Sequence, residues 1–222
     1  MKTLSTPCVL CASTNFEHWY QGQHGAIENR DYFACLECGL VQVPAEQQPG
    51  ASEEQAIYEL HQNNPQDPGY RRFLNRAFEP VVTRLKPGAS GLDFGSGPGP
   101  ALSLMFEEAG FSCANYDIYY ANEPARLHQD YDFITATEVF EHLSQPAQAL
   151  DTLCQCLKPG GLLMIMTQRA TSKAEFVSWR YIHDPTHISL FSDKSMDYIS
   201  QRWPLHELER RRDTVLWQKP RG

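Results

Sequence analysis

The sequence predicts an α/β fold with a mostly parallel sheet, preceded by a small cysteine-containing module. Short apolar runs alternate with helix-forming segments between residues 91 and 167, which is typical of strands joined by helices. Two Cys-x-x-Cys pairs stand near the N-terminus, outside that alternation. The two features occupy different parts of the chain, so we expect two structural units.

The alternation begins with the segment Gly91–Pro100 (GLDFGSGPGP), in which an apolar run ends at Asp93. Glycines at positions 95, 97 and 99 carry no Cβ, so a strand-to-helix turn here can bring its backbone against a ligand. Pro100 presets a helical φ, and residues 101–109 are strong helix formers. Strand, glycine turn and helix in this order predict a nucleotide-like cofactor at the turn.

A second strand is expected over residues 111–116, and it ends at Asp117. A carboxylate at the tip of the second strand can accept hydrogen bonds from ribose hydroxyls. The alternative is that the glycines form only a tight turn and that Asp117 caps a loop. The ordered series from strand to carboxylate favours the cofactor site.

The pattern then repeats. Residues 131–138 have the apolar content of a buried parallel strand, and residues 139–143 follow at its carboxyl end, where ligands bind in open parallel sheets. Ser144 can cap a helix whose apolar stripe extends to Leu157, and residues 158–161 are expected to stop it. Another buried strand is predicted over residues 162–167.

Together these motifs resemble the class I S-adenosylmethionine-dependent methyltransferases. The shared motifs are Asp-x-Gly-x-Gly-x-Gly at 93–99, the YDxIxxxEVxEH pattern at 131–142 and LKPGG at 157–161. The resemblance implies a Rossmann-like, mostly parallel sheet of the seven-stranded type that ends in an antiparallel pair. Residues 205–211 and 214–219 read as that final pair.

The resemblance also assigns the cofactor site residue by residue. It implies that Asp117 binds the ribose and that Glu138 and Val139 form the wall beside the sulfonium. The methionine part would be held by the glycine turn, namely Asp93, Gly95, Ser96, Gly97 and Gly99.

One departure from the family pattern concerns the adenine pocket. Only fourteen residues separate Asp117 from Asp132, and they include Pro124, so a full helix and third strand hardly fit. The family takes its adenine contacts from the end of that third strand. In this chain we expect them to come from Ile118, with Tyr119 and Tyr120 beside it.

The N-terminal cysteines, Cys8, Cys11, Cys35 and Cys38, are spaced as paired knuckles that can enclose a tetrahedral zinc ion. Disulfides are the alternative. The chain has seven cysteines, an odd number, and its first residues form no apolar signal segment, so zinc is favoured and a cytoplasmic location is expected. Four cysteine ligands close the site, so the metal would be structural. No chemistry is assigned to Cys113, Cys154 or Cys156.

A catalytic base is required if the methyl acceptor is a nitrogen or an oxygen that must lose a proton. The candidates are His142 and His187. The latter belongs to the segment 179–187, which follows the predicted strand 162–167 and should overhang the ligand cleft. This segment resembles the DPTHxxxF motif of bacterial methyltransferases of the zinc-ribbon type. Its aromatic residues suggest a small or planar acceptor, and a peptide side chain or a modified base is the alternative that the same loop could hold.

Composition limits the partners. The net charge of −8 argues against broad binding to nucleic acid, and no run of residues approaches the length of a membrane span. The exception is the run Arg210–Arg212, which is more typical of a solvated strand edge. We expect a zinc-ribbon module over residues 1–45, a linker with a short helix at 53–60 over residues 46–69, and a methyltransferase domain over residues 70–222.

The sequence therefore predicts an enzyme that transfers a methyl group to an unidentified acceptor. The alternative is a binding protein whose zinc ribbon holds a protein or nucleic acid, while the larger domain binds cofactor without turnover. A nicotinamide oxidoreductase is disfavoured, because Pro100 replaces the third glycine of its fingerprint and the EVFEH segment (residues 138–142) does not belong to that class.

Overall fold

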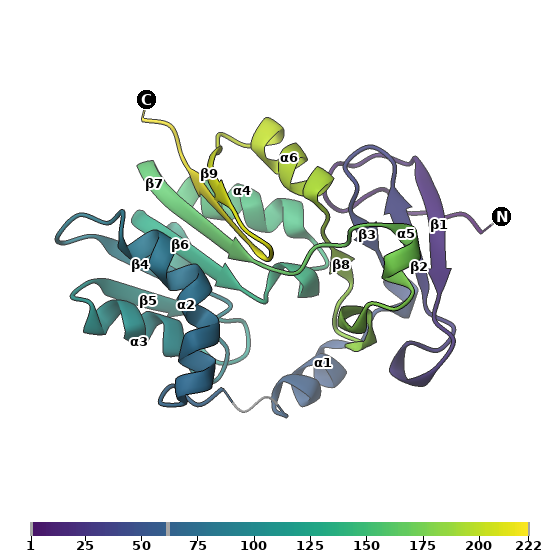
Figure 1. The fold of residues 1–222 in the computed structure, drawn as a ribbon, viewed down its shortest axis with the longest axis horizontal. Coiled ribbons are helices and arrows are strands. Elements are labelled where there is room, and N and C mark those ends of the chain that lie inside the picture. Colours follow the sequence, from purple (N-terminus) through teal and green to yellow (C-terminus); the bar gives the residue numbers. More distant parts are fainter. Residues whose placement is uncertain (1, 61–62, 222) are drawn as a thin grey trace.

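Two sheets of different size make up the fold. The computed structural model describes residues 2–60 and 63–221, and it shows a four-stranded and a six-stranded sheet side by side (Figure 1). The larger sheet is parallel from its first to its fourth strand and antiparallel at its last two. Its strands, in spatial order, are β5 (Ser112–Tyr116), β4 (Ser90–Phe94), β6 (Tyr131–Thr137), β7 (Leu157–Met166), β10 (Thr214–Gln218) and β9 (His206–Arg210).

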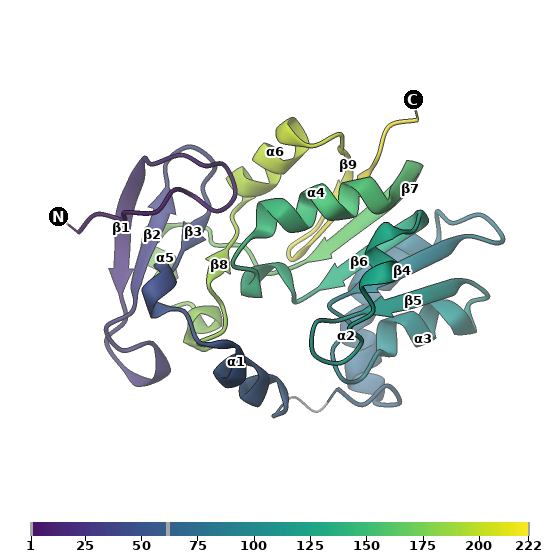
Figure 2. The same cartoon turned by 180° about the vertical axis from the view of Figure 1, so that it is seen from behind.

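Helices cover both faces of the larger sheet (Figures 1 and 2). On one face lie α2 (Pro68–Val82) and α3 (Ala101–Glu108), and on the other lie α4 (Pro146–Cys156) and α6 (Asp193–Arg202). Because side chains alternate along a strand, Phe133 packs under the first pair of helices and Ile134 under the second. Because both faces are covered, β6 is buried along almost its whole length.

The predicted Rossmann-like fold class is confirmed, and so is the shortened third-strand region. Between β5 and β6 the chain forms only a 3-10 helix, η3 (Pro124–His128), so the sheet has six strands among the described residues instead of seven. The two strands expected near the C-terminus are present as the antiparallel pair β9 and β10.

Three local predictions need correction. Residues 158–161 do not form a turn between a helix and a strand: α4 ends at Cys156 and β7 begins at once, because Gly160 donates a hydrogen bond to the carbonyl of Lys219. Ser144 does not cap α4, whose N-cap position is Gln145. The short helix expected at 53–60 is α1 (Ala51–Tyr58), in which Glu53 accepts a hydrogen bond from the amide of Gly50.

The smaller sheet brings distant parts of the chain together. Its spatial order is β1 (Phe16–Gln21), β2 (Asp31–Cys35), β3 (Val41–Gln42) and β8 (Ser189–Leu190), all antiparallel. The segment that leads into β8 contains α5 (Lys173–Phe176) and η5 (Arg180–His183). It packs on the same core as β2, through contacts such as that of Tyr32 with Phe176, whose ring centroids lie 5.3 Å apart.

The remaining elements are short. They are the 3-10 helices η1 (Gly25–Ile27), η2 (Ala45–Gln47) and η4 (Phe140–His142). None of the helices in the described part of the chain has the length and apolar character needed to cross a membrane. The division into module, linker and domain at residues 45 and 69 stays a prediction. The helix α2 begins at Pro68, two residues before the expected start of the domain, and β8 joins the N-terminal sheet.

Candidate active site

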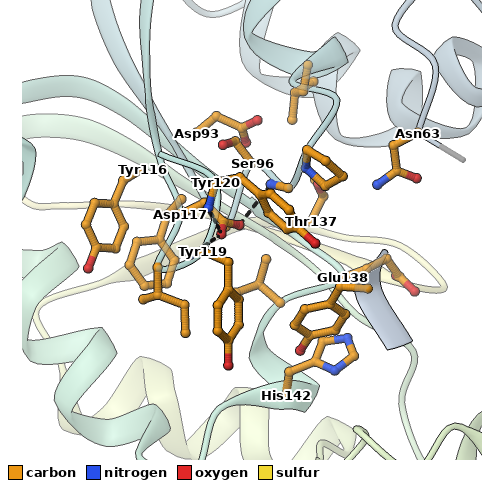
Figure 3. A pocket seen from close by; sticks show the side chains of 18 of the residues that line it. Asn63, Asp93, Ser96, Tyr116, Asp117, Tyr119, Tyr120, Thr137, Glu138 and His142 are labelled. Atoms are coloured by element: carbon orange, nitrogen blue, oxygen red, sulfur yellow. Dashed lines mark hydrogen bonds between the residues drawn. The ribbon is translucent and has the colours of Figure 1, made fainter. Parts of the chain in front are cut away.

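A cleft of about 740 Å³ lies at the carboxyl ends of β4, β5 and β6, and we call it the cofactor cleft (Figure 3). Its size is within the range of small-molecule and cofactor sites. The expected cofactor residues that line it are Asp93, Gly95, Ser96, Gly97, Asp117, Ile118, Glu138 and Val139. Parallel sheets place the tips of neighbouring strands at one edge, which is why residues from three strands meet here.

Asp117 ties the tip of β5 to the glycine turn. One carboxylate oxygen, Oδ2, accepts a hydrogen bond from the amide of Gly97 at 2.9 Å, and Oδ1 accepts from the amides of Tyr119 and Tyr120 at 2.9 and 3.1 Å (Figure 3). Gly97 has a φ of +64°, which favours glycine. The carboxylate is thereby held at the floor of the cleft in one orientation.

Gly99 has a different environment from the other glycines of the turn. It does not line the cleft; a Cβ there would lie 1.7 Å from the carbonyl oxygen of Asn63. Only glycine allows this close approach of two backbones, and Asn63 in turn lines the cleft. Gly99 therefore positions the segment that enters α2 and has no direct contact with the cavity.

Two buried polar groups at the turn have fewer partners than they could use. The hydroxyl of Ser96 is buried without a hydrogen-bond partner among the described residues. Asp93 is fully buried, and its carboxylate accepts a bond from the hydroxyl of Thr135 at 2.8 Å. Burial raises the pKa of Asp93 to about 7, with the nearby charge of Asp117 contributing. A ligand with hydrogen-bonding and cationic groups would satisfy both residues.

Aromatic residues form the wall of the cleft beyond Asp117. Tyr119 and Tyr120 line it, and the hydroxyl of Tyr120 is buried without a partner in the described chain. Tyr119 donates a hydrogen bond to Glu54 of α1 at 2.7 Å and packs edge-on against Tyr58, with ring centroids 5.9 Å apart. Ile118 is 55% exposed at the rim. This wall is where the adenine contacts were expected.

Glu138 stands where β6 ends, in an unusual conformation. Its φ is +53°, a value that is uncommon for a residue other than glycine and is found at functional sites. The hydroxyl of Tyr181 donates a hydrogen bond to Glu138 Oε2 at 3.3 Å. Burial, followed by the charge of Glu141, raises the pKa of Glu138 to about 8, so its carboxyl group is mainly protonated at neutral pH.

The two candidate bases lie together. The ring centroids of His142 and His187 are 4.7 Å apart, and both residues line the cofactor cleft together with Asp184. Nδ1 of His187 is 2.6 Å from the carbonyl oxygen of Tyr181, and Nδ1 of His142 is 3.2 Å from that of Thr186. Since a carbonyl only accepts, each Nδ1 carries the hydrogen in these contacts, which leaves the lone pair of a neutral ring on Nε2. Burial lowers the pKa of His187, which favours that neutral form.

Sequence reasoning missed several residues of this site. Glu141 is fully buried and accepts a hydrogen bond from Tyr181, whose ring lies 4.0 Å from that of His187 between centroids. Both residues belong to motifs that the sequence analysis singled out, so an interaction between these motifs could have been expected. Glu54 and Tyr58 come from the predicted linker, where the sequence gives no sign of a cleft-lining helix.

The four N-terminal cysteines form a compact cluster. Their sulfur atoms lie within 4.8 Å of one another, with 3.5 Å between Cys8 and Cys38 and 3.4 Å between Cys11 and Cys35. In each knuckle the amide after the Cys-x-x-Cys pair donates to the carbonyl of its first cysteine, from Ala12 to Cys8 and from Gly39 to Cys35. Four thiolates around zinc stand about 3.8 Å apart, given Zn–S bonds of about 2.3 Å, so the cluster fits a tetrahedral ion.

The fold and this cleft define a Rossmann-like α/β protein with a cofactor site at the carboxyl edge of its sheet. Residues 63–202 match a family model described as a methyltransferase domain, which is more than half of the chain. The chain therefore belongs to the methyltransferase-domain family, and its identification as a class I S-adenosylmethionine-dependent methyltransferase is confirmed at the level of family and fold.

Similar proteins agree with this family. The ubiquinone biosynthesis O-methyltransferase of Saccharophagus degradans is 35% identical over 86 residues, which are 38% of this chain and 36% of that protein. The chain thus matches little more than a third of that relative's length. Among solved structures, a 1,6-didemethyltoxoflavin-N1-methyltransferase from Burkholderia thailandensis has a TM-score of 0.51 at 14% identity, covering 84% of this chain and 98% of that one. An O-methyltransferase family protein from the same organism also has a TM-score of 0.51 at 14% identity, covering 79% and 65%.

Proposed function

We propose that this protein is an enzyme that binds S-adenosylmethionine in the cofactor cleft and transfers its methyl group to a small, planar acceptor by in-line displacement. The observation that carries the proposal is Asp117, whose carboxylate is fixed beside the glycine turn and faces the cleft. A carboxylate in this place suits the two hydroxyls of a ribose. When bound, S-adenosylmethionine supplies a methyl group already activated by its sulfonium.

The residues of the cleft fit the charges of this cofactor. Its sulfonium and amino groups are cationic, while Asp93 is a buried carboxyl group and Glu138 a partly buried one, and neither has an ion pair among the described residues. A cation beside either group would favour the charged carboxylate. In this proposal Asp93, Gly95, Ser96 and Gly97 hold the methionine part, Glu138 and Val139 border the sulfonium, and Ile118, Tyr119 and Tyr120 contact the adenine.

The imidazoles supply a base for an acceptor that must lose a proton. His187 is the stronger candidate, because burial keeps its ring neutral and its orientation is fixed through Nδ1. His142 is the second candidate, at the rim of the same group of residues. Either Nε2 would accept the proton of an acceptor hydroxyl or amine as the nucleophile attacks the methyl carbon.

The four-cysteine cluster is proposed to hold a structural zinc ion. The ligands are Cys8, Cys11, Cys35 and Cys38, which leave no open position for a water or substrate. Thiols that must remain reduced are consistent with the proposed cytoplasmic location. The zinc ion would stabilise the small sheet, which contacts the segment that carries His187.

The charge distribution favours a small-molecule acceptor over nucleic acid. The basic run at the C-terminal strands is largely neutralised: Arg210 pairs with Asp193, Asp197 and Glu207, and Arg211 pairs with Glu79 and Glu209. These contacts support the expectation that the run is a solvated strand edge.

Calorimetric titration of the zinc-replete protein with S-adenosylmethionine and S-adenosylhomocysteine tests the cofactor site. We expect micromolar dissociation constants, a common range for such ligands. Folded wild-type protein that binds neither compound would overturn the proposal and favour the alternative in which the ribbon is the working part.

Turnover is then measured as S-adenosylhomocysteine released in the presence of aromatic hydroxy and amino compounds. His187→Ala should lower kcat by about 100-fold or more while leaving cofactor affinity unchanged, and the exposed His128→Ala serves as the matched control. Full activity of His187→Ala would exclude His187 as the base, and His142→Ala would then be measured in the same way.

A further inference from the structure

A second cavity of about 1210 Å³ adjoins the cofactor cleft, and we call it the arginine cavity. The two cavities share the lining residues Phe73 and Glu138. Glu138 follows the β6 strand, beside the place proposed for the sulfonium. A molecule in the arginine cavity would therefore reach the cofactor at the point where its methyl group is expected.

Five arginines line this cavity, in a chain whose net charge is −8. Two of them are paired within the protein: Arg76 with Asp213, and Arg169 with Asp193. The other three have no ion pair within residues 2–60 and 63–221, and they are Arg72, Arg180 and Arg212.

The acidic residues of the lining do not cancel this charge. Asp193 and Asp213 are already engaged with arginines, and Glu138 also lines the cofactor cleft, where its charge would be balanced by the proposed sulfonium. Glu175 remains, and it accepts a hydrogen bond from Thr171 at the exposed rim. The cavity thus has a surplus of positive charge on the exposed side chains of Arg72, Arg180 and Arg212, and this surplus favours an anion as its ligand.

Arg169 adds an unused donor to this wall. Its side chain is 8% exposed, Nε donates to Asp193 at 2.8 Å, and a second nitrogen donates to the carbonyl of Arg211. The third nitrogen, Nη1, is buried without a partner in the described chain. Buried donors of a guanidinium are normally satisfied, so a group that belongs in this cavity is the natural partner.

An aromatic side chain gives the cavity a flat surface. Trp179 is half-buried, and its indole nitrogen donates to Gln168 at 3.2 Å, which fixes the ring. Its ring centroid lies 5.0 Å from that of Tyr181, whose hydroxyl reaches Glu138. A planar ring that packs on Trp179 would therefore extend toward Glu138 and the cofactor cleft.

We infer that the arginine cavity binds the methyl acceptor and that this acceptor is a planar molecule with an anionic group, either a carboxylate or a phosphate. The inference rests on the proposed function, since it names the acceptor class of the same enzyme. The arginines hold the anion, and Trp179 holds the ring.

Binding of three matched probes tests this inference. They are 2-naphthoate, 2-naphthyl phosphate and the uncharged 2-naphthamide, each titrated calorimetrically into the full-length protein with and without S-adenosylhomocysteine. We expect one of the anions to bind at least about tenfold more tightly than the amide, because charge-assisted hydrogen bonds to arginine are lost in the amide. The anion that binds better distinguishes a carboxylate from a phosphate acceptor.

The triple variant Arg72→Gln, Arg180→Gln and Arg212→Gln should remove this preference and keep its affinity for S-adenosylhomocysteine. Arg126→Gln is the control and should retain the preference, because Arg126 pairs with Glu123 three residues away and does not line the arginine cavity. Equal binding of anions and amide, no binding of any probe, or a preference that survives in the triple variant would overturn the inference. If the proposed function itself is wrong, the wild-type protein will not bind S-adenosylhomocysteine. If only this inference is wrong, the wild type will bind S-adenosylhomocysteine without preferring the anions.

Discussion

The carboxylate of Asp117 accepts a hydrogen bond from the amide of Gly97 at 2.9 Å. The residue proposed to bind the ribose therefore also fixes the shape of the glycine turn. The second oxygen of Asp117 is occupied by the amides of Tyr119 and Tyr120. One side chain thereby sets the geometry of two walls of the cofactor cleft. Loss of this carboxylate should affect binding more than the loss of one ligand contact.

Asp117→Ala should weaken binding of S-adenosylhomocysteine by about 10- to 100-fold, since hydrogen bonds to a charged group contribute about 1.5–3 kcal/mol. Calorimetric titration measures the effect. The exposed Asp130→Ala is the control and should bind as the wild type does. Unchanged affinity in Asp117→Ala would show that the ribose is bound elsewhere.

Gly99→Ala should destabilise the protein by about 1–3 kcal/mol, because the new Cβ would overlap the carbonyl oxygen of Asn63. Urea unfolding measures the free energy, and titration should show weaker cofactor binding as Asn63 is displaced from the cleft. Gly50→Ala provides the comparison: its φ is −73°, and the nearest atom to its added Cβ is 4.0 Å away. Equal stability of the two variants would contradict the close contact at Gly99.

Purified protein should contain one zinc ion per chain, measured by metal analysis. Cys38→Ser should lose the ion and lower the Tm, because the buried cluster would keep only three thiolate ligands. Cys113→Ala, which changes a buried core cysteine outside the cluster, should retain zinc even if its Tm falls. Zinc that persists in Cys38→Ser would show that the four sulfurs are not the site.

Protein stability should fall between about pH 4.5 and pH 8, partly because of Glu138. Burial raises the pKa of this carboxyl group to about 8 in the folded protein, against 4.5 for an ordinary glutamate. A raised folded-state pKa means that the stabilisation is present at low pH and is lost as the pH rises through about 8.

Glu138→Gln should therefore show a smaller decline in the free energy of unfolding over this range, measured with urea in zinc-containing buffer. Some decline should remain, since the pKa of Asp93 is also raised, to about 7. Glu107→Gln, at an exposed position of α3, should keep the wild-type dependence. The same slope in Glu138→Gln and the wild type would refute the role of Glu138.

Much of the larger sheet follows from local sequence. The motifs at 93–99 and 131–142 predict where β4 and β6 end and where the glycine turn lies, to within a few residues. Burial on both faces of the sheet explains the apolar residues in these strands. Proximity in the chain also predicts that Gly97 and Asp117 meet, because adjacent parallel strands bring their carboxyl ends together.

Other features depend on contacts that no local pattern reveals. The strand β8 has only two residues, too few for a recognisable alternation, and it forms because β3 offers an edge to pair with. The helix α1 is polar, so its role as part of the cleft wall could not be read from its residues. The arginine cavity likewise gathers residues from α2, the segment after β7 and the turn between β9 and β10.

The pairing of Val41 with Leu190 also has a consequence for synthesis on the ribosome. All four cluster cysteines leave the exit tunnel early, whereas the last strand of their sheet, Ser189–Leu190, is translated only after about 85% of the 222 residues. Metal capture by the nascent chain would therefore precede completion of the sheet. A ribosome-bound intermediate with loaded cysteines and an unpaired β3 edge is expected, and it would be protected from misassociation only when residues 189–190 arrive.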